Sequence, residues 1–215
     1  YGGRNLLLLT AILGAGAVLS LTRADQEVRY WYHSDMRSGS SDHFASMAKP
    51  FGDGMVMLPV YLGAFALKYM PTNKILQSVS LWGEYSLRMI LVGAPPVLAL
   101  QNGLGASRPT ENDSHWRPFN DDNSVSGHAF MGAVPFLAAG KMVKARLLKT
   151  GFYVASTFTG WSRINDDKHY FSQAVMGWLM AVLSSKSVSC RENHTMALMV
   201  APGKDRWTAT ISYNF

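Results

Sequence analysis

The chain has 215 residues, a length that suits one sizeable hydrophobic core and is short for two. Charged residues make up only 16% of it, against about 25% in an average soluble domain, and hydrophobic residues make up 48%. The net charge of +6 favours an anionic partner, but no Lys/Arg run exceeds two residues and the basic residues lie between apolar segments, which argues against a nucleic-acid-binding protein. Cys190 is the single cysteine, which excludes an intrachain disulfide and a cysteine metal cluster.

Six apolar stretches predict helices in chain order. They cover residues 5–21, 54–70, 75–100, 127–143, 146–161 and 169–185. The first carries no charged residue and approaches the about 20 residues that a membrane-spanning helix needs. It is either such a span or the apolar region of a signal peptide. In the third stretch, Pro95 and Pro96 predict an end or a kink.

The charges between these stretches alternate along the chain. Lysines and arginines without any acidic residue connect the fourth stretch to the fifth, whereas residues 22–53 hold four basic and five acidic residues and residues 101–128 hold two and four. The positive-inside rule gives this alternation for six spans with both termini in the cytoplasm. A helical bundle outside the membrane that shows the pattern by chance stays an alternative.

The C-terminal residues 206–215 alternate with a period of two, unlike the helical stretches before them. Apolar Trp207, Ala209, Ile211, Tyr213 and Phe215 alternate with polar residues, a pattern typical of a half-buried strand. The preceding "MALMV" and "APGKD" supply a partner strand and a turn, so we predict a C-terminal β-hairpin at about 195–215. The fold class predicted is therefore mainly α: one domain over 1–215, a membrane-associated six-helix bundle with its core at 54–186, followed by the hairpin.

Polar side chains gather in the connections that the charge pattern places on one side. Arg108, Arg117 and Arg163 have planar donor groups that suit the oxygens of a phosphate, and all three can converge on one anion. The stretch "SVSGH" opens the fourth helix, so backbone N–H groups near Ser126 and Gly127 form an anion site at a helix N-terminus. The loops therefore predict a phosphate site.

Three blocks of sequence resemble the type 2 phosphatidic acid phosphatase (PAP2) superfamily, which includes lipid phosphatases, bacterial acid phosphatases and vanadium haloperoxidases. The family pattern is Lys-x6-Arg-Pro, Pro-Ser-Gly-His, and Ser-Arg-x5-His-x3-Asp. The chain has "QNGLGASRP" at 101–109, "VSGH" at 125–128 and "SRINDDKHYFSQ" at 162–173, in the family's order. The resemblance covers about residues 75 to 185 and implies the family's helical bundle.

The resemblance also implies roles for individual residues. His169 is expected to be the nucleophile that forms a phosphohistidine, and His128 the general acid and then the general base. Arg108, Arg163, Ser126 and the Gly127 backbone are expected to hold the phosphoryl oxygens. Family members need no metal, so no metal and no cofactor are expected.

Three positions depart from the family pattern. Val125 replaces a proline, Gln101 replaces the lysine of the first block, and Gln173 replaces the aspartate of the last block. Gln101 is thus a weak phosphate ligand at best, and Arg117 or Lys168 is expected to substitute for the missing cation. Gln173 is expected to orient His169 less effectively than an aspartate, unless one of the acidic residues at 166 and 167 does so.

The function predicted is a phosphatase for a phosphomonoester or pyrophosphate of a membrane lipid, at a bacterial inner membrane with its site facing the periplasm. Its partners are then a phosphorylated lipid substrate and the membrane. Alternatives are a soluble periplasmic acid phosphatase, an outer-membrane-associated protein, a vanadium haloperoxidase, or a weakened homologue that binds phosphate or lipid headgroups without turnover.

Overall fold

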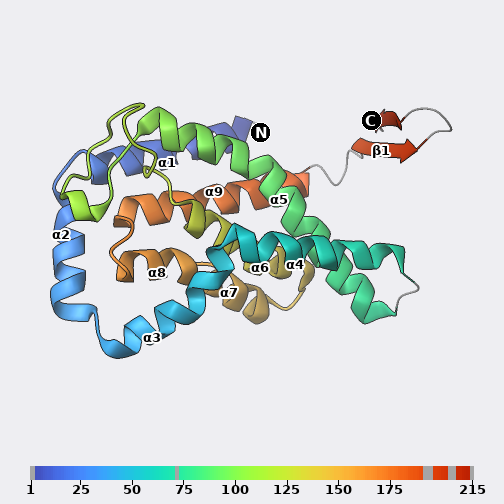
Figure 1. Cartoon of the computed structure of the whole chain (residues 1–215), viewed down its shortest axis with the longest axis horizontal. Coiled ribbons are helices and arrows are strands. Elements are labelled where there is room, and N and C mark those ends of the chain that lie inside the picture. Colours follow the sequence, from blue (N-terminus) through green and yellow to red (C-terminus); the bar gives the residue numbers. More distant parts are fainter. Residues whose placement is uncertain (1–2, 71–72, 191–195, 203–206, 214–215) are drawn as a thin grey trace.

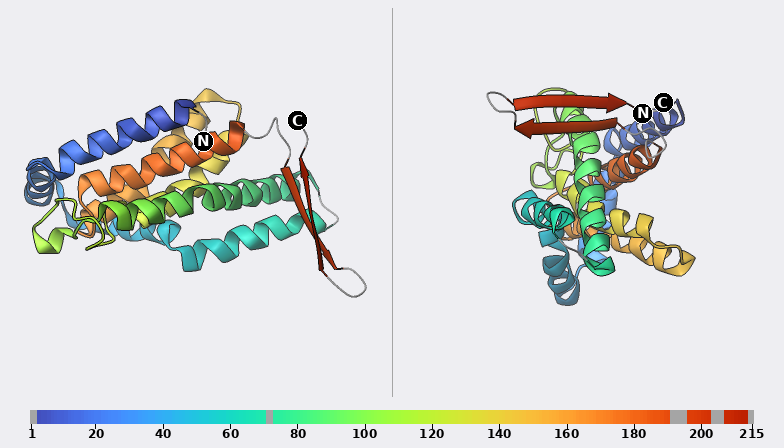
Figure 2. Two further views of the ribbon diagram at one scale, coloured as in Figure 1. Left: turned by 90° about the horizontal axis from the view of Figure 1, so that it is seen from above. Right: turned by 90° about the vertical axis from the view of Figure 1, so that its right-hand side faces the viewer.

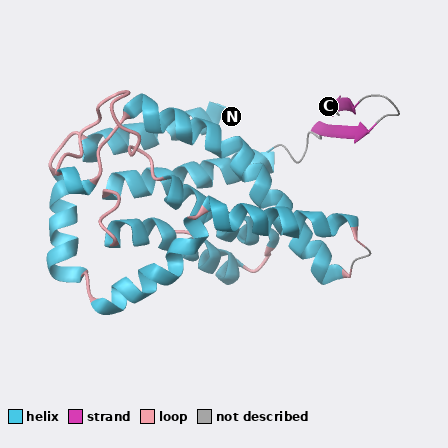
Figure 3. Cartoon of the chain, in the orientation of Figure 1, coloured by secondary structure: helices cyan, strands magenta, loops and turns pink. Residues whose placement is uncertain are grey.

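A computed structural model of the chain describes residues 3–70, 73–190, 196–202 and 207–213 (Figure 1). The described part is mainly helical, as predicted (Figure 3). Its α-helices are α1 (Gly3–Ser20), α2 (Ala24–Trp31), α3 (Gly39–Ala48), α4 (Gly54–Ala66), α5 (Lys74–Leu104), α6 (Gly127–Met142), α7 (Arg146–Ala155), α8 (Phe158–Asn165) and α9 (Phe171–Cys190). Shorter helical turns are η1 (Tyr32–Met36), η2 (Lys49–Gly52), η3 (Leu67–Tyr69) and η4 (Pro109–Glu111).

Helix α6 is the centre of the bundle. It contacts α5, α7, α8 and α9, and most of its residues are buried. Its sequence is apolar on every side, which is typical of a helix enclosed by others. Close approach depends on small residues: an ideal Cβ on Gly132 would lie 2.3 Å from Thr159 of α8, and one on Gly177 of α9 would lie 2.3 Å from the Ser126 carbonyl oxygen.

The helix boundaries differ from the predicted ones in three places. Residues 24–48, expected to be a connection, form α2 and α3. The stretch 146–161, expected to be one helix, is broken at Ser156 and Thr157 into α7 and α8. Helix α5 does not end at Pro95 or Pro96 but continues to Leu104, with Met89, Gly93 and Val97 buried, and a kink at the prolines stays a prediction. Burial of this face offsets the backbone hydrogen bonds that the prolines remove.

The structure supports fewer membrane spans than the six expected. By length and apolar composition, α5 is the one described helix that can cross a membrane. The number rises to three if each of two bent pairs counts as one span, namely Asn5–Ser20 with Ala24–Met36 and Gly39–Gly52 with Gly54–Tyr69. Helices α6 and α7, with 16 and 10 residues, are shorter than the about 20 residues of a typical span.

Two strands follow the bundle, β1 (Met196–Pro202) and β2 (Trp207–Tyr213). They pair antiparallel from Met196 opposite Tyr213 to Pro202 opposite Trp207, and Figure 2 shows them beside the helices. The connection at 203–206 lies outside the described residues, so the C-terminal hairpin as a whole stays a prediction.

Several connections between helices lie at the same end of the bundle. The 105–126 connection, α2 and the turn between α8 and α9 all lie at the left end in Figure 1, away from the α4–α5 connection. This end brings together the three sequence blocks singled out above.

Candidate active site

The N-terminus of α6 carries Ser126, Gly127 and His128. Ser126 is the N-cap residue: its hydroxyl accepts a hydrogen bond from the Ala129 N–H at 3.2 Å. Its own N–H donates to the Gln173 carbonyl at 2.9 Å, which ties α6 to α9. The first N–H groups of α6 therefore point toward the loop end of the bundle, where an anion is stabilised by the helix dipole.

Gln101 supports this loop from α5. Its amide Nε2 donates to the Val125 carbonyl oxygen at 2.7 Å, and the same nitrogen would lie 3.3 Å from a Cβ on Gly127. Ser124 adds a second link, since its hydroxyl donates to the Leu100 carbonyl at 2.9 Å. Gln101 therefore holds the backbone of the predicted phosphate loop, and its role as a phosphate ligand stays a prediction.

His169 lies in the tight turn between α8 and α9. The N–H groups of Lys168 and His169 both donate to the Arg163 carbonyl, at 2.9 and 3.2 Å. Asp167 in this turn has a positive φ of 54° and is held by Arg29 of α2, whose Nε and Nη2 donate to its two carboxylate oxygens at 2.7 and 2.6 Å. The turn buries His169, which is 8% exposed.

Gln173 fixes the proton of His169. The Gln173 Oε1 accepts from the Tyr170 N–H at 3.1 Å, and its Nε2 donates to the Ser107 carbonyl oxygen at 2.9 Å. These two partners permit only one orientation of the amide, because an N–H must meet an oxygen and a carbonyl must meet the amide N–H₂. The His169 Nδ1 lies 3.0 Å from Oε1 and must therefore carry the proton. The other ring nitrogen, Nε2, keeps its lone pair.

The protonated form of His169 is disfavoured. Burial lowers the pKa of His169 to about 4; the Gln173 hydrogen bond opposes this shift, and Arg163, Arg108 and His128 add to it. His169 is therefore neutral above about pH 4, the state that a nucleophile requires.

His128 lies within the electrostatic reach of the same cations. Burial is the main cause that lowers its pKa, and Arg163, Lys49 and Arg108 lower it further while Asp53 raises it. The two histidines lie on neighbouring segments, because the Ser126 N–H donates to the Gln173 carbonyl and the Gln173 side chain contacts His169. That they form one active site stays a prediction.

Arg163 of α8 is a buried cation with unused donors. Its side chain is 9% exposed, and within the described residues its Nε and Nη1 have no hydrogen-bond partner. The nearest carboxylate oxygen, Oδ2 of Asp166, lies 3.7 Å from Nη1. Buried donors are normally paired, so unpaired ones beside two histidines indicate a place for an anion. Arg108 is exposed next to the site and its Nε donates to Asn123 Oδ1 at 3.0 Å.

The expected substitutes for the missing cation lie at the surface. Arg117 forms an ion pair with Asp113, and Lys168 is exposed, so their part in the phosphate site stays a prediction. The acidic residues of the turn do not orient His169 either: Asp167 is held by Arg29, and His169 Nδ1 is held by Gln173.

Sequence reasoning missed Asp25 of α2. Asp25 is 1% exposed, its Oδ1 accepts from the Ser172 N–H at 2.9 Å, and its Oδ2 accepts from the Ser172 hydroxyl. A carboxylate in this place satisfies a free N–H at the start of α9, the helix that carries Gln173. No local pattern reveals it, because 147 residues separate the partners.

The family model described as PAP2 superfamily matches residues 83–195, more than half of the chain. The chain belongs to the PAP2 superfamily. No curated protein and no solved structure matches it. PAP2 superfamily membership indicates phosphatase-type activity, and the matched segment contains all three sequence blocks.

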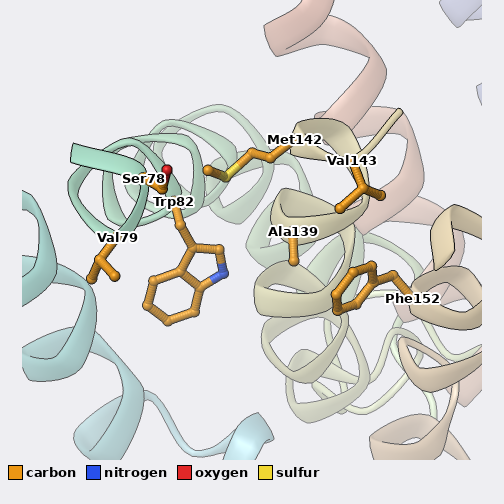
Figure 4. A pocket seen from close by; sticks show the side chains of 7 residues that line it. All are labelled: Ser78, Val79, Trp82, Ala139, Met142, Val143 and Phe152. Carbon is orange, nitrogen blue, oxygen red and sulfur yellow. The ribbon is translucent and has the colours of Figure 1, made fainter. Parts of the chain in front are cut away.

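An apolar hollow in this PAP2 protein lies away from the histidines. It has a volume of about 260 Å³ between the first turns of α5 and the α6–α7 connection (Figure 4), and its lining is Ser78, Val79, Trp82, Ala139, Met142, Val143 and Phe152. The hydroxyl side chain in this lining is that of Ser78, which donates to the Lys74 carbonyl oxygen at 3.0 Å. The lining has no side chain that can act as a general acid or base or neutralise a phosphate, so the hollow does not suit phosphoryl transfer. Within the described residues, no group of three or more His, Cys, Asp or Glu side chains is arranged to hold a metal ion.

Proposed function

We propose that this protein hydrolyses a phosphomonoester or pyrophosphate, carried by a membrane lipid, through a phosphohistidine on His169. The observation that carries the proposal is the hydrogen-bond network of Gln173. It places the proton of His169 on Nδ1 and leaves Nε2 with a lone pair in a site lined with cations.

In the first step, Nε2 of His169 attacks phosphorus and the bond to the leaving oxygen breaks. The protonated His128 gives its proton to that oxygen, so the alcohol or phosphate leaves with its charge neutralised. In the second step, His128 takes a proton from water, the water oxygen attacks phosphorus, and the P–N bond breaks. His169 then returns to the neutral form with its proton on Nδ1.

The transition state is stabilised by groups that are already in place. Arg163 offers unpaired donors, Arg108 adds a second guanidinium, and the N-terminus of α6 offers N–H groups near Gly127. Donors positioned before the reaction stabilise developing negative charge without a reorganisation cost.

A lipid substrate is supported by the outer surface of the bundle. Large apolar side chains of α4 and α5 are exposed, among them Met55 at 87% and Leu91 at 74%. The basic connection after α6 lies at the opposite end of that helix from His128. This polarity supports an inner-membrane location with the site facing the periplasm.

The proposal is tested by phosphate release from purified protein in detergent. The substrates are p-nitrophenyl phosphate, phosphatidic acid and undecaprenyl pyrophosphate. His169→Ala should abolish release, whereas His43→Ala, an exposed histidine of α3, should retain it. Equal release by wild type and His169→Ala would refute the proposal. Phosphate binding by a folded wild type without release would instead favour a headgroup-binding homologue.

A further inference from the structure

The turn η2 lies against the residue that carries the general acid. An ideal Cβ on Gly52 would lie 2.7 Å from the His128 carbonyl oxygen and 3.1 Å from its Cβ. The Thr159 hydroxyl of α8 donates to the Ala48 carbonyl oxygen at 3.0 Å, immediately before the turn. The start of the turn, Lys49, is thus held between α6 and α8, although it lies outside the residues that the family model matches.

The ammonium group of Lys49 is directed to the cation cluster of the site. Its Nζ lies 3.9 Å from Asp166 Oδ2, and the same oxygen lies 3.7 Å from Arg163 Nη1. One carboxylate oxygen is therefore shared by two cations at distances too long for a hydrogen bond. With Arg108 also present, the cluster has more positive than negative charge and suits a dianion.

The electrostatics at His128 agree with this placement. Lys49 acts in the same direction as Arg163 and Arg108 in lowering the pKa of His128, and Asp53 opposes all three. The charge of Lys49 therefore reaches the general acid itself.

Gln101 stands at the position where the family pattern has a lysine, and it has a structural role. Gln101 donates to the Val125 carbonyl, so its amide holds the loop rather than supplying charge. We propose that Lys49 supplies the third cation of the phosphate site, in place of the lysine that the PAP2 pattern has at position 101. This inference rests on the proposed phosphatase function. A lysine suits the role because its ammonium is a compact charge with three donors on a flexible stem.

The test compares Lys49→Met with Lys68→Met. Lys68 is a matched control: its side chain is 53% exposed, as is that of Lys49, and it pairs with a carboxylate, Glu84. The inhibition constant for inorganic phosphate and the KM for p-nitrophenyl phosphate should rise about tenfold in Lys49→Met, the lower range for a hydrogen bond to a charged group. Both should stay at the wild-type value in Lys68→Met. Lys49→Arg should retain most of the affinity because it keeps the charge.

A double variant tests whether a lysine at position 101 can replace Lys49. Gln101→Lys introduced into Lys49→Met should restore phosphate affinity, and a folded double variant without restoration would overturn the claim that both positions serve one phosphate. Unchanged phosphate inhibition in Lys49→Met, in a protein whose activity depends on His169, would overturn the inference and leave the phosphatase proposal intact. Loss of the His169 dependence would instead refute the proposed function.

Discussion

The amide of Gln173 makes three hydrogen bonds whose donor and acceptor roles depend on one another. Its Oε1 serves both the Tyr170 N–H and His169 Nδ1, and its Nε2 serves the Ser107 carbonyl. A glutamine that reaches back to the N–H at the start of its own helix is half of a capping box. Gln173 therefore both stabilises α9 and orients His169, the proposed nucleophile. What it lacks is the negative charge that would stabilise the imidazolium.

Replacing this amide with a carboxylate should therefore change the charge without removing the contact to His169. In Gln173→Glu, which keeps the length of the side chain, we expect the pKa of His169 to rise from about 4, because a nearby negative charge favours the protonated form. The acid limb of the kcat/KM profile should then move to higher pH, since protonated His169 cannot attack. At pH values above the acid limb of both the wild type and the variant, kcat of the variant should exceed that of the wild type about tenfold or more, because the carboxylate stabilises the charge that develops on the His169 ring. A pH–rate profile checks both, and an unchanged rate would show that the amide does not limit catalysis.

The two histidines together predict an acidic optimum. Attack needs neutral His169, so kcat/KM should fall as the pH drops through about 4. Protonation of the leaving group needs charged His128, whose pKa is lowered from 6.5, so kcat/KM should also fall as the pH rises through a value below 6.5. A bell-shaped profile between these limits is the expected result. A plateau that extends above pH 7 would contradict the role of His128.

Substrates with different leaving groups distinguish the roles of His128 and His169. His128→Ala should lower the rate on an alkyl phosphate by about 10²–10⁴-fold, the usual contribution of general acid catalysis. The loss should be much smaller for p-nitrophenyl phosphate, because p-nitrophenolate leaves readily without a proton. His169→Ala should abolish activity on both substrates. An equal loss on both substrates in His128→Ala would argue against proton donation to the leaving group.

At the scale of helices, the site depends on how closely α9 approaches the start of α6. Gly177 makes this approach possible, because a Cβ there would lie 2.3 Å from the Ser126 carbonyl oxygen and 3.1 Å from the Ala129 side chain. This contact positions Ser126 relative to α9. The Ser126 N–H also donates a hydrogen bond to the Gln173 carbonyl oxygen. Any separation of α6 from α9 therefore moves Ser126 and Gly127, the proposed phosphate-binding residues, away from His169.

Gly177→Ala should consequently reduce both stability and activity. Overpacking of a tight contact costs about 1–3 kcal/mol of unfolding free energy, and we expect activity to fall with it. Gly151→Ala in α7 is the control, because nothing lies within 4 Å of a Cβ there. It should raise the unfolding free energy by about 0.5–1 kcal/mol, because alanine favours helix over glycine. Thermal unfolding and phosphate release check both variants, and equal stability for the two would contradict the packing argument.

Sequence periodicity predicts the apolar helices of the bundle and misses the polar ones. Helices α2 and α3 have few buried residues, and side-chain contacts to distant parts of the chain support them, such as Arg29 with Asp167 and Asn165 with Asp42. Such partners are separated by more than 100 residues, so no local pattern predicts them. The three motif blocks predict that His128, Arg163 and His169 share one site. Backbone hydrogen bonds join the segments that carry them, from Ser126 to Gln173 and from His169 to Arg163, and the shared site itself stays a prediction. Lys49 and Asp25 lie outside those blocks and are recognised only from the fold.

At the scale of the whole molecule, a cluster of basic residues and the proposed active site lie at opposite ends of α6. His128 lies at its N-terminus, and the exposed Lys144, Arg146 and Lys149 follow its C-terminus. The 16 residues of α6 correspond to about 24 Å along the helix axis. No acidic residue occurs between Asp122 and Asp166, so the basic end has no counter-charge in this part of the sequence.

This polarity predicts which end of the molecule faces the cytoplasm. In a Cys190→Ser background, which removes the single native thiol, Asp122→Cys should react with a membrane-impermeant maleimide in intact spheroplasts. Lys144→Cys should react only after lysis, because a basic connection is retained on the cytoplasmic side. Both positions are exposed, so burial does not limit either reaction. Labelling of both in intact spheroplasts would place the two ends of α6 on one side of the membrane, and the alternation of charge would then reflect a bundle outside the bilayer that reaches its lipid substrate from the surface.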